Sequence, residues 1–173
     1  MLDLSDNLKS LALLILLDAT WQRIVANRSK HVRTWLFIDE MQLLLSNDYA
    51  VDYFDMLWTR SRKYGAIPTG ITQNIERLLN IEKTRLMVAN SDYLVLLGQS
   101  QTDAIALGGV LALSDDQIGY IRNSGVGEGL LVANGKIIPY EDRIPEDTQL
   151  YRVTTTKIDD LAAIEGSVVS KSV

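Results

Sequence analysis

Two patterns of apolar and polar positions alternate along the chain. Short apolar runs with no polar alternation indicate buried strands. Segments whose apolar positions recur at helical spacing indicate helices. The runs lie at 34–40, 66–72 and 92–97, and the helical patterns at 4–27, 50–64, 75–79, 83–90, 101–107 and 115–121. Apolar strands that alternate with helices predict an α/β domain with a mainly parallel sheet flanked by helices.

The C-terminal third adds a hairpin to this scheme. Two apolar runs within 129–140 flank Asn134-Gly135, and a two-residue Asn-Gly link of this kind is typical of a type I′ turn. Pro139 and Pro145 then indicate where the chain leaves the sheet. A further strand is expected over 151–156. The domain is expected to span 1–156, with 157–173 a mobile C-terminal tail.

Three details of packing follow from the same patterns. The first helix is apolar almost all round from Leu11 to Leu17, so we expect neighbours to cover it on several sides. The run that begins at Thr34 is expected to be buried on both faces. Gly108-Gly109 is expected to separate the two helices around it.

The run at 34–40 ends abruptly in two carboxylates, Asp39 and Glu40. Ligands of open α/β sheets bind outside the carboxyl ends of the strands, so this pair would lie where chemistry takes place. A first carboxylate can orient a hydrated Mg²⁺, and a second can orient or deprotonate the attacking water. The same residues also fit a strand that stops in a solvated acidic turn with no function.

Polar residues follow the other two strands in the same way. Thr72-Gln73 follows the second run, and Gly98-Gln99 follows the third. Because parallel strands end at one edge of a sheet, we expect all three polar ends to lie along one edge. This coincidence favours a functional role for Asp39 and Glu40.

Basic residues gather at the end of the helix at 50–64. Arg60, Arg62 and Lys63 precede Gly65, a residue typical of the position after a helix. Cations near a helix C-terminus are favourable without any function. That explanation accounts comfortably for one basic residue and less well for three.

Composition narrows the class of protein. The 173 residues suit one domain, and there is no cysteine. The single histidine, His31, has no nearby Cys or His, which argues against zinc. We expect His31 to lie in a basic surface linker, Arg28 to Arg33. The net charge of −5 argues against a dominant nucleic-acid surface but not against a local basic patch. The longest apolar run is too short for a transmembrane segment, and the first residues lack the basic cluster of a signal peptide. The absence of cysteine is compatible with a cytoplasmic protein.

Together these motifs resemble a known family. The segment Trp35 to Glu40 is similar to a Walker B strand. The order of this strand, the helix ending Arg60 to Gly65, and the strand Gly70 to Asn74 resembles the RecA-type motor of conjugative type IV secretion. More narrowly, the chain resembles the C-terminal part of the TraC/TrsE-type traffic ATPase, and the similarity covers about residues 2–140, including Thr84-Arg85, 89–91 and 127–131.

The resemblance implies roles for individual residues. Asp39 would hold Mg²⁺ and Glu40 would activate the hydrolytic water. Gln73 would sense the γ-phosphate of ATP, and Arg62, or else Arg60, would complete the pocket of a neighbouring subunit in a ring, a hexamer in the intact protein. Such a motor acts in the cytoplasm, peripherally at the inner face of the membrane, with other secretion-channel subunits as partners and DNA as an indirect one.

One motif of the family is missing. The sequence contains no G-x-x-x-x-G-K-[ST], and Glu128 stands in the glycine-rich segment 125–129, where a phosphate site needs a cation. We therefore expect a partial P-loop domain in which the phosphate-binding loop lies upstream, ATP and Mg²⁺ bind only the intact protein, and these residues alone are inactive and self-associate. Two alternatives remain: a fragment of an FtsK/HerA-like DNA-pumping ATPase, and a non-catalytic module that binds secretion-complex subunits.

Overall fold

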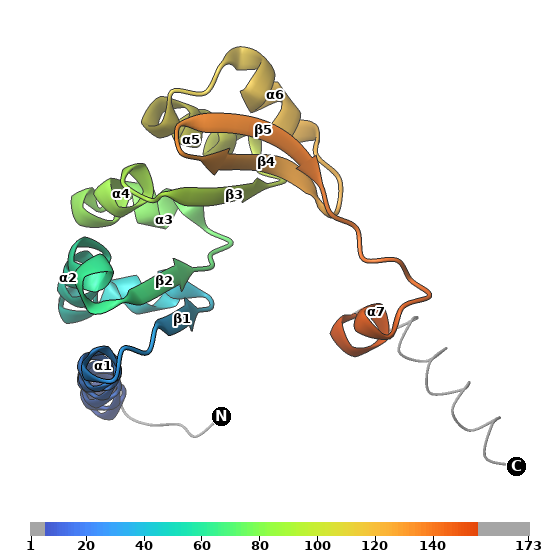
Figure 1. Cartoon of the computed structure of the whole chain (residues 1–173). Coiled ribbons are helices and arrows are strands. Elements are labelled where there is room, and N and C mark those ends of the chain that lie inside the picture. The colour runs from blue at the N-terminus through green and yellow to red at the C-terminus, as the bar shows by residue number, and fades with distance from the viewer. Residues whose placement is uncertain (1–5, 156–173) are drawn as a thin grey trace, which may run out of the picture. The chain divides into compact units, whose positions relative to one another are not determined.

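The computed structural model describes residues 6–155, and its elements are shown in order in Figure 1. The described residues form two compact units. The first comprises 6–92 and 101–114, and the second comprises 93–100 and 115–155. Each unit has its own small sheet.

The sheet of the first unit contains two parallel strands joined by a helix. Strand β1 (Thr34–Ile38) pairs with β2 (Ala66–Gly70) in the register Thr34 to Ala66 and Ile38 to Gly70. Helix α2 (Asp48–Tyr64) connects them and runs back along the strands, as a parallel crossover requires. The Asn47 side chain caps its first turn. Gly65 ends the helix at φ 66°, and this C-terminal glycine is the one that the sequence predicts.

Helices supply the rest of the first unit. They are α1 (Asp6–Ser29), the 3₁₀ helix η1 (Met41–Ser46), α3 (Ile75–Asn80), α4 (Glu82–Ala89) and α5 (Gln101–Leu111). Their core is apolar, with Ile24, Phe54, Leu57 and Leu107 almost fully buried. Helix α2 contacts α1, α4 and η1, so its apolar stripe organises this core.

The second unit is an antiparallel sheet with a helix packed on it. Its strands lie in the order β3 (Tyr93–Leu97), β4 (Glu128–Ala133) and β5 (Lys136–Glu141), and α6 (Asp115–Asn123) packs against β4. Asn134 and Gly135 both have positive φ, 51° and 73°, which confirms the type I′ hairpin. A short helix, α7 (Gln149–Thr154), follows.

Several predictions of topology are wrong. The sheet is not mainly parallel, because β3 pairs with β4 in antiparallel fashion and is not bonded to β1 or β2.

Helix α5 continues through Gly108-Gly109, and Gly108 is buried, so the missing side chain suits close packing better than a break. Pro139 lies within the edge strand β5, where a missing N–H is tolerated. Residues 149–154 form a helix, whereas the sequence predicts a strand over 151–156. The predicted tail at 157–173 lies outside the described residues.

Two predictions of burial are also wrong. Leu17 and Ile24 of α1 are buried, but Leu16 is 62% exposed, so the described residues cover one side of this helix. Trp35 and Phe37 project from the same face of β1 and are exposed, Phe37 by 65%. These apolar side chains are of the kind that a larger assembly buries. Within residues 6–155, no helix combines the length and the apolar character needed to cross a bilayer.

Gly129 controls the pairing of β3 with β4 and provides a test of the second unit. A Cβ at this position would overlap the carbonyl oxygen of Leu96 and approach the ring of Tyr140. We expect Gly129→Ala to destabilise the protein by about 1–3 kcal/mol, as overpacking does. The matched control is Gly119→Ala in α6, where a Cβ meets no atom within 4 Å and the gain in helix propensity is about 0.5–1 kcal/mol. Urea denaturation measures both, and equal midpoints for Gly129→Ala and the parent protein would contradict the close approach of β4 to β3 at this residue.

Candidate active site

The carboxyl ends of β1 and β2 are tied together by backbone hydrogen bonds. The N–H of Ile71 donates to the carbonyl of Ile38 at 2.8 Å, and the N–H of Met41 donates to the carbonyl of Ile71 at 3.0 Å. The residues that follow the two strands, Asp39-Glu40 and Thr72-Gln73, therefore lie side by side. The prediction that the polar ends of the first two strands lie along one edge is confirmed.

Glu40 connects β1 to η1 through an unusual backbone conformation. Its φ of 48° and ψ of 41° are left-handed, and its N–H donates to Oδ1 of Asp39 at 2.9 Å. Such a conformation costs a residue other than glycine about 1–3 kcal/mol and is found most often at functional sites. The turn holds both carboxylates at the end of the strand.

The Glu40 carboxylate accepts a hydrogen bond on each oxygen. The side-chain amide of Gln73 donates to Oε1, and that of Gln42 donates to Oε2. Gln73 is 33 residues away in sequence, so the parallel pairing of the strands creates this contact. Each carboxylate oxygen keeps a second lone pair, which is free to accept a proton or hold a water molecule.

Gln42 is a member of this cluster that the sequence interpretation missed. Its side chain is 7% exposed, and its Oε1 accepts a hydrogen bond from Thr72 Oγ at 2.6 Å. Gln42 thus connects Glu40 on one strand end to Thr72 on the other. The sequence does carry a signal for Gln42, because it is the single polar residue in the apolar segment 41–45.

Asp39 is exposed beside this cluster, where a ligand can reach it. Among residues 6–155 no group of three or more His, Cys, Asp or Glu side chains forms a ready metal cage. Mg²⁺ on a nucleotide does not need one, because one or two carboxylates, water and the phosphates complete its octahedron. The exposed Asp39 carboxylate therefore fits an Mg²⁺ ion that arrives with a nucleotide.

Arg60 and Arg62 lie at the opposite end of the sheet. Helix α2 ends at Tyr64, next to the first residues of the strands, where the N–H of Thr34 donates to the carbonyl of Gly65. The carboxylates of Asp39 and Glu40 lie beyond the last residues of β1. Both arginines are exposed. The structure therefore does not bring them to Glu40 within one chain.

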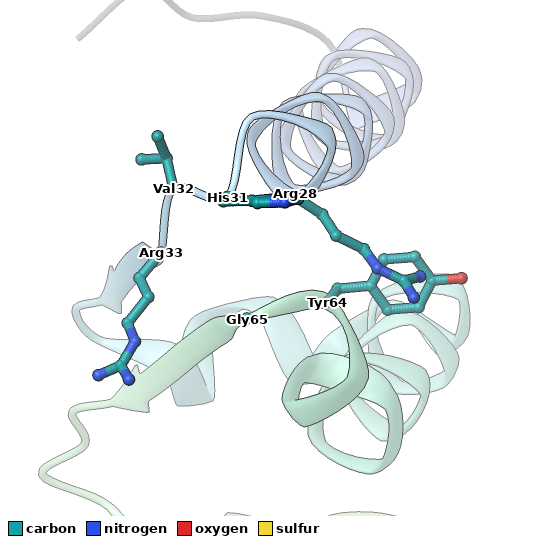
Figure 2. Close-up of a pocket in the computed structure, with 6 residues that line it drawn as sticks. All are labelled: Arg28, His31, Val32, Arg33, Tyr64 and Gly65. Carbon is teal, nitrogen blue, oxygen red and sulfur yellow. The ribbon is translucent and has the colours of Figure 1, made fainter.

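A small pocket of about 160 Å³ lies at this amino-terminal end of the strands (Figure 2). Its lining comprises Arg28, His31, Val32, Arg33, Tyr64 and Gly65. The guanidinium of Arg28 lies over the ring of Tyr64, 4.7 Å from its centre, while Arg33 points away from it (Figure 2). The exposed His31 belongs to this basic linker, as the sequence predicts.

The end of the third predicted strand, Gly98-Gln99, follows β3, which does not belong to the sheet of β1 and β2. Gln99 belongs to the second unit, where its N–H donates to the carbonyl of Ile121 at 3.0 Å. The expectation of one edge shared by three strands is therefore wrong. It assumed that β3 pairs in parallel with the first two strands.

Comparison with known proteins places this arrangement in a wider context. No protein-family model matches the chain, and no curated protein gives a match. Among solved structures, the chain is similar to VirB4 of Thermoanaerobacter pseudethanolicus, with a TM-score of 0.71 and 25% sequence identity. The match covers 83% of this chain and 39% of the VirB4 chain, so the present residues have the α/β fold of a part of that protein.

Proposed function

We propose that these residues are the Walker B part of a motor ATPase of the TraC/TrsE type, which in its intact form couples ATP hydrolysis to conjugative type IV secretion. The observation that carries the proposal is the contact of Glu40 with Gln73 at the joined ends of two parallel strands. The match to VirB4, a type IV secretion ATPase, supports it independently of the motifs.

The residues at the strand ends divide the chemistry between them. Asp39 would hold Mg²⁺, which would supply charge neutralisation to the phosphates of a bound nucleotide. Glu40 orients the attacking water and takes its proton on one of its free lone pairs. Gln73 reports the state of the γ-phosphate to Glu40, because its amide can donate either to the carboxylate or to a phosphate oxygen.

In this proposal the phosphate-binding loop lies outside these residues, and the ring forms with neighbouring subunits. The sequence offers no P-loop motif, and the VirB4 match is partial. Arg62, with Arg60 as the second candidate, would act on the ATP of a neighbouring subunit, which agrees with its position at the far end of the sheet. A head-to-tail contact of this kind closes into a ring, a hexamer in our proposal.

The remaining elements of the proposal concern the surroundings of the motor. Its site of action is the cytoplasmic side of the membrane, with secretion-channel subunits as partners and DNA as an indirect one. An FtsK/HerA-like DNA-pumping motor would use the same strand ends. A non-catalytic assembly module would keep the fold but not need Glu40, and the transfer experiment of the Discussion separates it from the motor.

Calorimetric titration of Mg-ATP into the 173-residue chain tests whether the phosphate-binding loop lies outside these residues. We expect no saturable binding, because neither Asp39 nor Glu40 can hold a triphosphate without free backbone amides and a cation. Asp39→Ala is the control variant. Saturable binding that Asp39→Ala abolishes would show a complete nucleotide site within these residues and refute the division of the site that we propose.

A further inference from the structure

One oxygen of the Glu40 carboxylate is held by a chain of hydrogen bonds that begins at the backbone. The N–H of Asn74 donates to the hydroxyl oxygen of Thr72 at 3.2 Å, and the hydroxyl donates in turn to Oε1 of Gln42 at 2.6 Å. The amide nitrogen of Gln42 then donates to Oε2 of Glu40. The chain joins the segment after β2 to the turn after β1 through the buried Gln42 side chain.

The two ends of this chain require the same orientation of the Gln42 amide. A backbone N–H always donates, so the bond from Asn74 leaves the proton of the Thr72 hydroxyl to point to Gln42. An amide that accepts at its oxygen presents its NH₂ group at the other end, where the ionised Glu40 carboxylate accepts and cannot donate. The reversed amide would set two oxygens against each other at Glu40.

The two oxygens of Glu40 are therefore held differently. Gln42 is buried, so its amide would lose a bond that water does not readily replace if it left Oε2. Gln73, which donates to Oε1, is exposed, and its amide can turn to another acceptor at little cost. Oε2 is the fixed oxygen of the carboxylate, and Oε1 is the oxygen that can be released.

We infer that Gln42 is a positioning residue of the hydrolytic site, which fixes Oε2 of Glu40 and so directs Oε1 towards the attacking water. The inference rests on the proposed ATPase function and adds to it the oxygen that acts as the base. When Gln73 turns to the γ-phosphate, Oε1 loses a donor, stays in place and can take the proton of the water. Such positioning matters, because a displacement of 1 Å costs ~10²-fold in rate. Gln42 acts through Glu40 and touches neither ATP nor the water.

Turnover by the intact protein tests the role of Gln42. Gln42→Met keeps the length of the side chain and removes both the donor to Glu40 and the acceptor for Thr72. The variant should fold, because the Thr72 hydroxyl has a second acceptor in the carbonyl of Asn74 at 3.3 Å, and the thermal midpoint checks this. We expect kcat to fall about 10- to 10²-fold, with the KM for ATP and nucleotide binding unchanged. The matched control, Gln22→Met on the exposed surface of α1, should alter neither constant.

Variants of Thr72 test whether the chain of hydrogen bonds acts through Gln42. Thr72→Val should lower kcat, because Gln42 loses the donor that fixes its orientation, and Thr72→Ser should recover most of the loss. Combined with Gln42→Met, Thr72→Val should lower kcat little further, as expected for two residues of one network. Losses that multiply in the double variant would overturn the chain from Thr72 to Glu40.

NMR on the 173-residue chain separates this inference from the proposed function, because the side-chain NH₂ signals of Gln42 and Gln73 need no hydrolysis. We expect the Gln42 amide to be rigid on the picosecond-to-nanosecond timescale, the Gln73 amide to be mobile, and Thr72→Val to mobilise Gln42. Equal mobility of the two amides would overturn the inference. An intact protein that Glu40→Gln inactivates and Gln42→Met leaves fully active would overturn it too. Turnover that survives Glu40→Gln would overturn the proposed function itself, and the role of Gln42 in hydrolysis with it.

Discussion

Replacing Glu40 by glutamine in the intact protein is expected to abolish ATP turnover and preserve ATP binding. The amide has nearly the same shape but cannot take a proton from water, and loss of a general base typically lowers the rate about 10²–10⁴-fold. The hydrogen bonds to Glu40 can adapt, because the exposed Gln73 amide can reverse and present its oxygen. Steady-state hydrolysis and nucleotide binding, measured on the same preparation, check the prediction.

The control for Glu40→Gln is Glu76→Gln, the same change at an exposed position in the first turn of α3. It should leave turnover unaltered. A transfer assay in cells then decides between the motor and the assembly module. Normal transfer by the Glu40→Gln protein would mean that Glu40 performs no hydrolysis that transfer needs, and the module would be the better account.

Replacing Arg62 by alanine is expected to abolish turnover in the assembled ring and to leave nucleotide binding by a single subunit intact. An arginine supplied by a neighbour is typically worth about 10³–10⁵ in rate. The position of Arg62, at the end of α2 remote from Glu40, allows it to reach a second chain but not its own carboxylate. Hydrolysis measured as a function of protein concentration checks this, with the adjacent and also exposed Lys63→Ala as the matched control.

Mixing two inactive variants gives the sharpest form of the Arg62 test. A ring that contains both Arg62→Ala and Glu40→Gln subunits has some interfaces in which an intact Glu40 faces an intact Arg62. Partial activity should return on mixing, although each variant alone is inactive. If no activity returns while mixed rings assemble, Arg62 does not act across an interface, and the same experiment with Arg60→Ala tests the second candidate.

The pattern of residues determined the local structure well. Helix α2 lies close to its predicted range because its apolar stripe, Asn47 cap and Gly65 terminator agree with one another. The hairpin was predictable because Asn134-Gly135 adopts positive φ at little cost. The meeting of Glu40 with Gln73 was foreseen in outline, because parallel strands joined by a helix end at a common edge.

Tertiary contacts decided what the pattern could not. The apolar segment of β3 suits a parallel or an antiparallel neighbour equally well, and only its pairing with β4 across about thirty residues made the second sheet antiparallel. The same limit applies to Gln42, whose role depends on burial between two strand ends. The sequence by itself determined helix α2, the hairpin turn and the acidic end of β1, because these depend on neighbouring residues. Strand partners and the polar network around Glu40 depend on residues far apart in the chain, so only the folded structure decided them.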